Sequence, residues 1–134
     1  MKANKIKKEI VKDEEGNIVT ISVSYTNKFG HFEGVAKTHP EDLYIATEEE
    51  GINLATLRAD IQYMKVRKRI ARERYETLKG FIVNSQHFKG YDNDSLEAKC
   101  LRRRAAELKT DYFLYRLTLV KLQALERVWA GRAK

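Results

Sequence analysis

The chain has 134 residues, a formal net charge of +7, 43% hydrophobic residues and one cysteine, Cys100. This length fits a single domain, 1–134, and the lone cysteine excludes an internal disulfide and favours a reducing compartment. With no signal-peptide pattern and no apolar run long enough to span a bilayer, the sequence predicts a soluble cytoplasmic protein without a membrane partner.

The N-terminal part is typical of a small β-meander. Residues 18–26 place apolar side chains at every second position, with Val19 on the same face as Ile21, and this spacing predicts a strand. Turn-forming sequences at 13–17 and 27–31 separate this strand from a preceding strand and a following strand. Because three strands with one apolar face are too small to be stable alone, that face is expected to pack on helices or on another subunit.

The segment that follows the meander offers no catalytic or metal-binding pattern. His39 lies near Asp42, but no nucleophile or metal ligand stands at a diagnostic spacing. We therefore interpret His39 as a residue that stabilises the junction between the sheet and the first helix by hydrogen bonds. The other histidines, His31 and His87, are distant and lack cysteine partners. No glycine-rich loop follows a strand. The sequence therefore predicts a protein that is not an enzyme, with no catalytic residue, metal or cofactor.

A helical hairpin is predicted for roughly 47–130, with a turn at 87–94. Both halves repeat apolar residues at alternating spacings of three and four, which predicts two helices packed along their length. Sequences resembling capping boxes at 47–50 and 94–97 mark the N-terminal ends of the two predicted helices. The seam, interrupted only by Lys68, comprises Leu54, Leu57, Ile61, Met64, Ala71, Tyr75, Leu78 and Ile82, then Leu101, Ala105, Leu108, Tyr112, Tyr115, Leu119 and Leu122.

The predicted fold is therefore α+β. It consists of a three-stranded antiparallel β-meander (1–40), a junction with the first long helix (41–92), and the second long helix (93–134). The second helix carries a further apolar stripe that one partner helix cannot cover, so we expect a homo-oligomer, a dimer or higher, most simply built on the second helices. This stripe comprises Phe113, Leu117, Val120, Ala124 and Val128.

Side chains suited to a small anionic nucleotide concentrate in the turn and just after it. Aromatic rings stack on bases, carboxylates and amides bind ribose hydroxyls, and arginines with helix N-terminal amides bind phosphates. In the alternative interpretation the same residues only form the turn, cap the helix and face solvent. The predicted ligand-binding residues are Phe88, Tyr91, Asn93, Asp94, Arg102 and Arg103.

A second hypothesis follows from the basic residues of the helices. Six lysines and arginines crowd the middle of the first helix, and 102–104 is an arginine triplet. Such a surface could bind nucleic acid or a nucleic-acid-binding defence enzyme, in the manner of an anti-CRISPR-type inhibitor. Binding would then weaken steeply with salt, and Arg69 and Arg72 would matter more than the turn. A helical hairpin with a purely structural role is the third hypothesis.

The layout resembles that of small phage proteins. The β-meander, the junction Gly-Val-Ala-Lys-Thr-His-Pro-Glu-Asp at 34–42 and the two long helices are similar to the first-described class of anti-Thoeris sponge proteins, in size and architecture over most of the chain. The resemblance implies an oligomer that sequesters cyclic ADP-ribose isomers made by a bacterial immune sensor and releases them unaltered. It also implies ligands between subunits near helix ends and, for a phage-encoded protein, action in the host cytoplasm.

Overall fold

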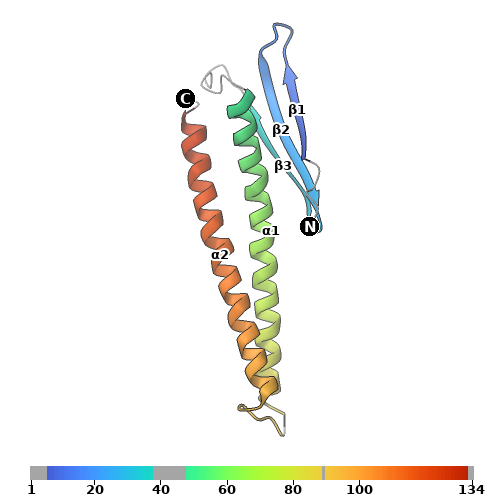
Figure 1. The fold of residues 1–134 in the computed structure, drawn as a ribbon, viewed down its shortest axis with the longest axis vertical. Helices are drawn as coiled ribbons and strands as arrows, with labels where there is room; N and C mark the ends of the chain where they lie inside the picture. The colour runs from blue at the N-terminus through green and yellow to red at the C-terminus, as the bar shows by residue number, and fades with distance from the viewer. Residues whose placement is uncertain (1–5, 38–47, 89, 133–134) are drawn as a thin grey trace. The chain divides into compact units, whose positions relative to one another are not determined.

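A computed structural model of the protein describes residues 6–37, 48–88 and 90–132 (Figure 1). The strands are β1 (Ile6–Lys12), β2 (Ile18–Asn27) and β3 (Gly30–Lys37), and the helices are α1 (Glu48–Ser85) and α2 (Leu96–Arg132). The predicted α+β fold, a β-meander followed by two long helices, is confirmed. The junction around His39 and the start of the capping sequence at 47 lie outside the described residues. Neither helix has, within the described residues, an apolar stretch long enough to cross a membrane.

The chain forms two compact units. Unit 1 comprises Met1–Lys65 and Thr118–Lys134, and unit 2 comprises Val66–Leu117. The β-sheet therefore belongs to unit 1, and the turn between the helices belongs to unit 2. Helices α1 and α2 each contribute a segment to both units.

The sheet of unit 1 is antiparallel, with strand order β1-β2-β3. Both predicted turns are confirmed: Gly16, with φ of 84°, lies in the first, and Gly30, with φ of 134°, opens β3 after the second. Positive φ at these positions favours glycine, which has no Cβ to clash with the backbone. In the first turn, one carboxylate oxygen of Asp13 accepts hydrogen bonds from the backbone N–H groups of Glu15 and Asn17, each 2.9 Å long.

One face of β2 supplies the core, as predicted, with a correction at the start of the strand. Ile21 and Val23 are almost completely buried. Val19, expected on the same face, is exposed, whereas Ile18 packs against the core. The pairing register with β1 shifts between Val11 and Lys12, and such an irregularity reverses which side chains point inwards.

The buried face of the sheet packs on α1 through very small residues. A Cβ atom added to Gly34 of β3 would lie 1.9 Å from the backbone oxygen of Ala55 and 2.5 Å from the backbone nitrogen of Ala59. Ala36, two residues along β3, is also buried, as are Ala55 and Ala59 themselves. Only glycine at position 34 allows the strand and the helix backbone to approach this closely.

Three polar contacts join the elements of unit 1. The guanidinium of Arg58 on α1 donates to the backbone oxygen of Val35 over 2.7 Å and lies 3.4 Å from the carboxylate of Glu126 on α2. The hydroxyl of Tyr25 on β2 donates to Asp60 of α1 over 2.8 Å. Burial of the Tyr25 ring raises the pKa of its hydroxyl, and the hydrogen bond and charge of Asp60 raise it further.

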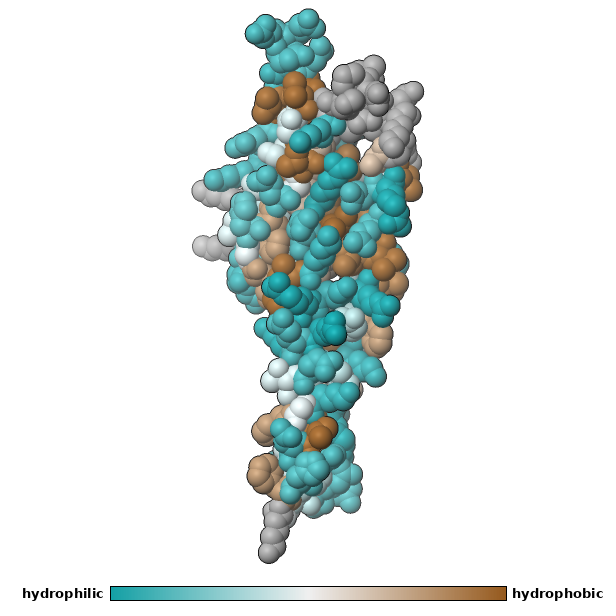
Figure 2. All heavy atoms as spheres, turned by 180° about the vertical axis from the view of Figure 1, so that it is seen from behind, coloured by the Kyte–Doolittle hydropathy of each residue, from teal (hydrophilic) through white to brown (hydrophobic). Residues whose placement is uncertain are grey.

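The predicted helical seam is confirmed, because every seam residue of both helices is buried or half-buried. In unit 1, Leu57, Ile61 and Leu119 form a buried cluster against which Trp129 packs. The second stripe of α2 is exposed: Phe113, Leu117, Val120 and Val128 retain between 49% and 53% of their accessible surface. Figure 2 shows apolar side chains at the surface among hydrophilic ones. The expected oligomer on α2 stays a prediction.

Replacement of Gly34 by alanine should lower the free energy of unfolding by roughly 1–3 kcal/mol, the usual cost of overpacking, because the new methyl group overlaps the α1 backbone. Gly80→Ala is the matched control, since a Cβ there meets nothing within 4 Å and an exposed helical glycine gains stability on this change. Urea denaturation measures both variants. Equal stability of Gly34→Ala and wild type would contradict the close approach.

A pH effect is expected from Tyr25. The folded protein holds the phenolic proton of Tyr25 more tightly than the unfolded chain does, and this difference stabilises the fold. The stabilisation is complete below about pH 10, the usual tyrosine pKa, and is lost as pH rises further. Tyr25→Phe removes it, so the stability of wild type should fall more steeply above pH 10 than that of the variant. Parallel curves from urea denaturation between pH 8 and about 11 would refute the effect.

Candidate anion-binding site

Nearly all of the net positive charge of the protein lies in unit 2. Residues 66–117 contain 13 lysines and arginines against 7 aspartates and glutamates, a net charge of +6, while the whole chain has +7. A surface with this excess attracts anions over a distance. An anion-binding site is therefore expected in unit 2.

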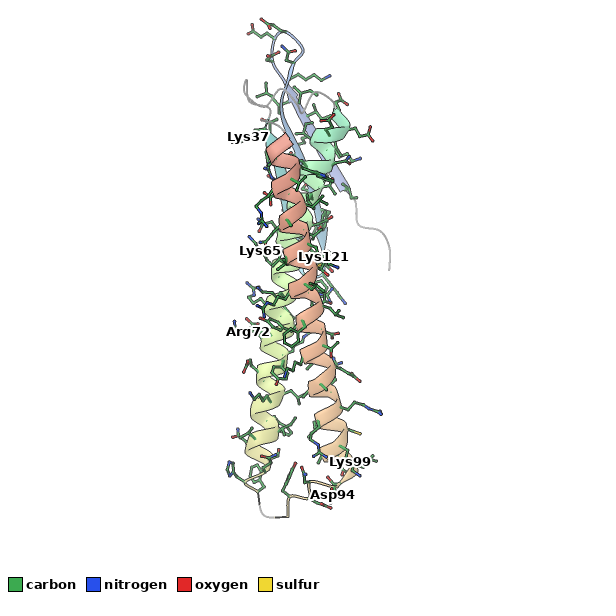
Figure 3. All side chains as sticks on the ribbon, turned by 90° about the vertical axis from the view of Figure 1, so that its left-hand side faces the viewer. Lys37, Lys65, Arg72, Asp94, Lys99 and Lys121 are labelled. Atoms are coloured by element: carbon green, nitrogen blue, oxygen red, sulfur yellow. The ribbon has the colours of Figure 1, made fainter. Side chains whose placement is uncertain are left out.

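The turn of unit 2 is held together by its own polar side chains. The side-chain oxygen of Asn93 accepts hydrogen bonds from the Tyr91 hydroxyl over 3.1 Å and from the Arg102 guanidinium over 2.6 Å. One residue earlier, the carboxylate of Asp92 accepts from the backbone N–H of Asp94 over 2.9 Å. Asp94 and Lys99 lie at this end of the helices (Figure 3).

The cap of α2 differs by one residue from the prediction. Ser95, not Asp94, accepts the helix-capping hydrogen bond, from the backbone N–H of Ala98 over 3.1 Å. The capping sequence therefore begins at 95, and the backbone N–H of Asp94 belongs to the preceding turn, where it donates to the Asp92 carboxylate.

The structure brings together three of the six predicted ligand-binding residues. Tyr91, Asn93 and Arg102 are linked through the Asn93 oxygen, as described above. Phe88 is 71% exposed, and Asp94 and Arg103 are exposed as well. Since the Asn93 oxygen already accepts two hydrogen bonds, these contacts suit closure of the hairpin, and a ligand-binding role for the six residues stays a prediction.

A recess of about 280 Å³ lies elsewhere in unit 2, between its α1 and α2 segments. Each helix contributes a cation and a tyrosine to this recess, which we call the aromatic recess. Its lining residues are Arg72, Tyr75 and Glu76 of α1 and Lys109, Tyr112 and Phe113 of α2.

Helical spacing explains how these side chains come to line one recess. Tyr75 and Tyr112 occupy seam positions of their helices, so both point towards the neighbouring helix. Arg72 and Lys109 each precede a seam tyrosine by three residues, one helical turn, and therefore lie on the same side of their helix as that ring. The recess thus combines two exposed cations with aromatic walls; Arg72 projects from α1 in Figure 3.

Two of the ring-bearing walls pack together, and a third cation lies over another ring. The ring centroids of Tyr112 and Phe113 are 5.7 Å apart, and the ammonium of Lys79 lies 5.9 Å from the centroid of Tyr75. Phe113 is half exposed, so part of its face is open to a ligand. Glu76 adds one carboxylate, which can accept hydrogen bonds from hydroxyl or amino groups.

The cations of unit 2 have different roles. The guanidinium of Arg67 hydrogen-bonds to the Tyr115 hydroxyl, and its carbon lies 4.7 Å from the centroid of that ring. This contact joins the two helices. Within the described residues, by contrast, Arg72 and Lys109 make no hydrogen bond or ion pair, so their charges are available to an anion.

Sequence reasoning missed the aromatic recess. A signal was present, since both helices carry a cation three residues before a seam tyrosine, at 72 and 75 and again at 109 and 112. The spacing within each helix does not determine the register between the two helices. That register decides whether the cation–tyrosine pair of α1 lies at the same level as the pair of α2.

The described residues contain no group of three or more histidine, cysteine, aspartate or glutamate side chains placed to hold a metal ion. No protein-family model, curated protein or solved structure matches the chain.

Proposed function

We propose that the protein binds a small anionic nucleotide in the aromatic recess and releases it unaltered. The observation that carries this proposal is the placement of Arg72 and Lys109, one from each helix, beside the aromatic side chains of a single recess. Phosphate oxygens form charge-assisted hydrogen bonds with such cations. These hydrogen bonds are about twice as strong as hydrogen bonds between neutral groups. A nucleic-acid base stacks on aromatic side chains.

The size and polarity of the recess favour a ligand with one base. A volume of about 280 Å³ lies just below the range of roughly 300–1,000 Å³ that is usual for drug-sized ligands. Glu76 can accept a hydrogen bond from a ribose hydroxyl or a base amino group. A base, its ribose and its phosphates thus each have a matching group in the recess.

The resemblance to anti-Thoeris sponge proteins gives this proposal its specific form. A cyclic ADP-ribose isomer has an adenine ring, ribose hydroxyls and a pyrophosphate, and these match the rings, the carboxylate and the two cations of the recess. In this form the protein is a phage anti-defence protein that sequesters the immune signal in the host cytoplasm as a homo-oligomer. It acts by binding and catalyses no reaction.

Neutral variants of the two cations test the proposed site. Arg72→Gln and Lys109→Gln should each weaken binding of cyclic ADP-ribose or adenosine monophosphate by about tenfold or more, because each removes a hydrogen bond between charged groups. Isothermal titration calorimetry measures the affinity, and chromatography of the recovered nucleotide should show it unchanged.

Phe88→Ala in the turn and Arg103→Gln near the start of α2 serve as matched controls, and both should leave the affinity within about threefold of wild type if the recess is the site. Loss of binding in these controls alone would place the ligand on the six residues that the sequence predicts. A wild-type protein that binds neither nucleotide would contradict the proposed function.

Nucleic-acid binding is the second candidate, and the charge of unit 2 favours it. Arg69, Arg72 and Arg74 are all exposed along one segment of α1. If they contact phosphates, affinity for a labelled single-stranded oligonucleotide should fall by about tenfold or more between 50 and 200 mM salt, because bound counterions are released.

Fluorescence anisotropy measures this dependence, and Arg69→Gln should reduce its slope. The position of Arg69 outside the aromatic recess separates the two candidates, since nucleotide binding should not change in this variant. An affinity for the oligonucleotide that does not respond to salt would exclude the second candidate.

A further inference from the structure

Exposed cations continue beyond the aromatic recess on both helices of unit 2. On α1, Lys79 follows the recess cation Arg72 by seven residues, and on α2, Arg116 follows Lys109 by the same interval. Seven residues are close to two helical turns, so the second cation lies on nearly the same side of its helix as the first. All four side chains are exposed, and we call these four residues the cation row.

The cation row has three levels along unit 2. Arg72 and Lys109 share the level of the recess that both of them line. Because the two helices run antiparallel (Figure 1), Lys79 lies nearer the turn than Arg72, whereas Arg116 lies farther from the turn than Lys109. At 1.5 Å per residue each step is about 10.5 Å, so the row extends over about 21 Å. This length exceeds what the phosphates of one nucleotide can span.

Aromatic rings alternate with the cations of the row. Phe113 lies between the two cations of α2, four residues after one and three before the other, and its ring is 49% exposed. On α1, Tyr75 lies between the two cations, and the Lys79 ammonium is 5.9 Å from the centroid of its ring. Proteins that bind single-stranded nucleic acid combine the same two elements, cations along the phosphate chain and rings on which bases stack.

Neighbouring carboxylates leave the cation row with an excess of positive charge. Within the described residues the four cations form no ion pair, whereas two nearby carboxylates are paired with cations outside the row. Glu73 lies 3.9 Å from Arg69, and Glu107 lies 3.1 Å from Arg104. Glu76 adds one negative charge in the recess, so four cations and one carboxylate give a net charge of +3.

We propose that the cation row binds a short single-stranded segment of nucleic acid, with one base in the aromatic recess and phosphates on both sides of it, at Lys79 and Arg116. A mononucleotide occupies only the level of Arg72 and Lys109. A base of a double helix is paired and must be extruded before it can enter a recess. This binding mode rests on the proposed function, because the recess must accept a nucleotide, and it extends the ligand from one nucleotide to several.

Neutral variants of the two outer cations test the row. Lys79→Gln and Arg116→Gln should each weaken binding of a labelled single-stranded oligoadenylate of about six nucleotides by about threefold or more. Each should also reduce the slope of log affinity against log salt concentration by about 0.7, the value for one phosphate contact to a single strand. Fluorescence anisotropy measures both quantities. Affinity for adenosine monophosphate, from isothermal titration calorimetry, should stay within about twofold of wild type because the recess is unchanged.

Arg74→Gln is the matched control. Arg74 is an exposed arginine of α1 two residues after Arg72, and it therefore points about 200° away from the row around the helix. This variant should leave both affinities within about twofold of wild type. Circular dichroism should show equal helix content in all variants.

Three outcomes would overturn the cation row and leave the proposed nucleotide site intact. The wild-type protein could bind adenosine monophosphate but not the oligoadenylate, or it could bind single and double strands of equal length equally well. Arg74→Gln could weaken oligoadenylate binding as much as Lys79→Gln and Arg116→Gln do. Absence of binding to both ligands would contradict the proposed function as well as the row.

Discussion

The close approach of β3 to α1 at Gly34 is the constraint on which unit 1 depends. Three short strands cannot bury enough apolar surface to be stable by themselves, so the sheet needs a helix against one face. Gly34, Ala55 and Ala59 bring the two backbones together, and the Ile21 and Val23 side chains are then buried. Arg58 and Asp60 add hydrogen bonds at the same contact. Because α1 begins in this unit, the sheet fixes the side of α1 that remains available for the seam with α2.

Unit 2 is stabilised in a different way and is suited to a different role. Among its described residues there is no β-strand, and the helical seam and the contact of Arg67 with Tyr115 hold its segments together. Its net charge of +6 opposes compactness through self-repulsion, whereas the rest of the chain is close to neutral. An anion placed between Arg72 and Lys109 would reduce this repulsion. The division of charge thus separates a nearly neutral scaffold, unit 1, from a basic unit 2 that a bound anion would stabilise.

Much of this fold follows from sequence periodicity, while the site does not. Alternation at 20–25 and the three-four spacing of the seam give the strand and the helices directly, because burial on one face is local to each element. The side chain of Ile18, not that of Val19, points into the core because the pairing register with β1 shifts. The contact at Gly34 depends on which helix covers the sheet. The aromatic recess likewise needs the register between α1 and α2. The six predicted ligand-binding residues carry suitable chemistry, but in the structure Tyr91 and Arg102 both donate to the side-chain oxygen of Asn93.

In our proposal, unit 2 binds an anionic nucleotide between its helices. The most direct measurement is a titration of the isotopically labelled protein with cyclic ADP-ribose, followed by the shifts of the backbone amide resonances in NMR spectra. Saturable shifts centred on Tyr75, Glu76 and Tyr112 are the result expected from a ligand in the aromatic recess. Shifts confined to residues 86–95, or no shift at all at a large excess of nucleotide, would contradict it.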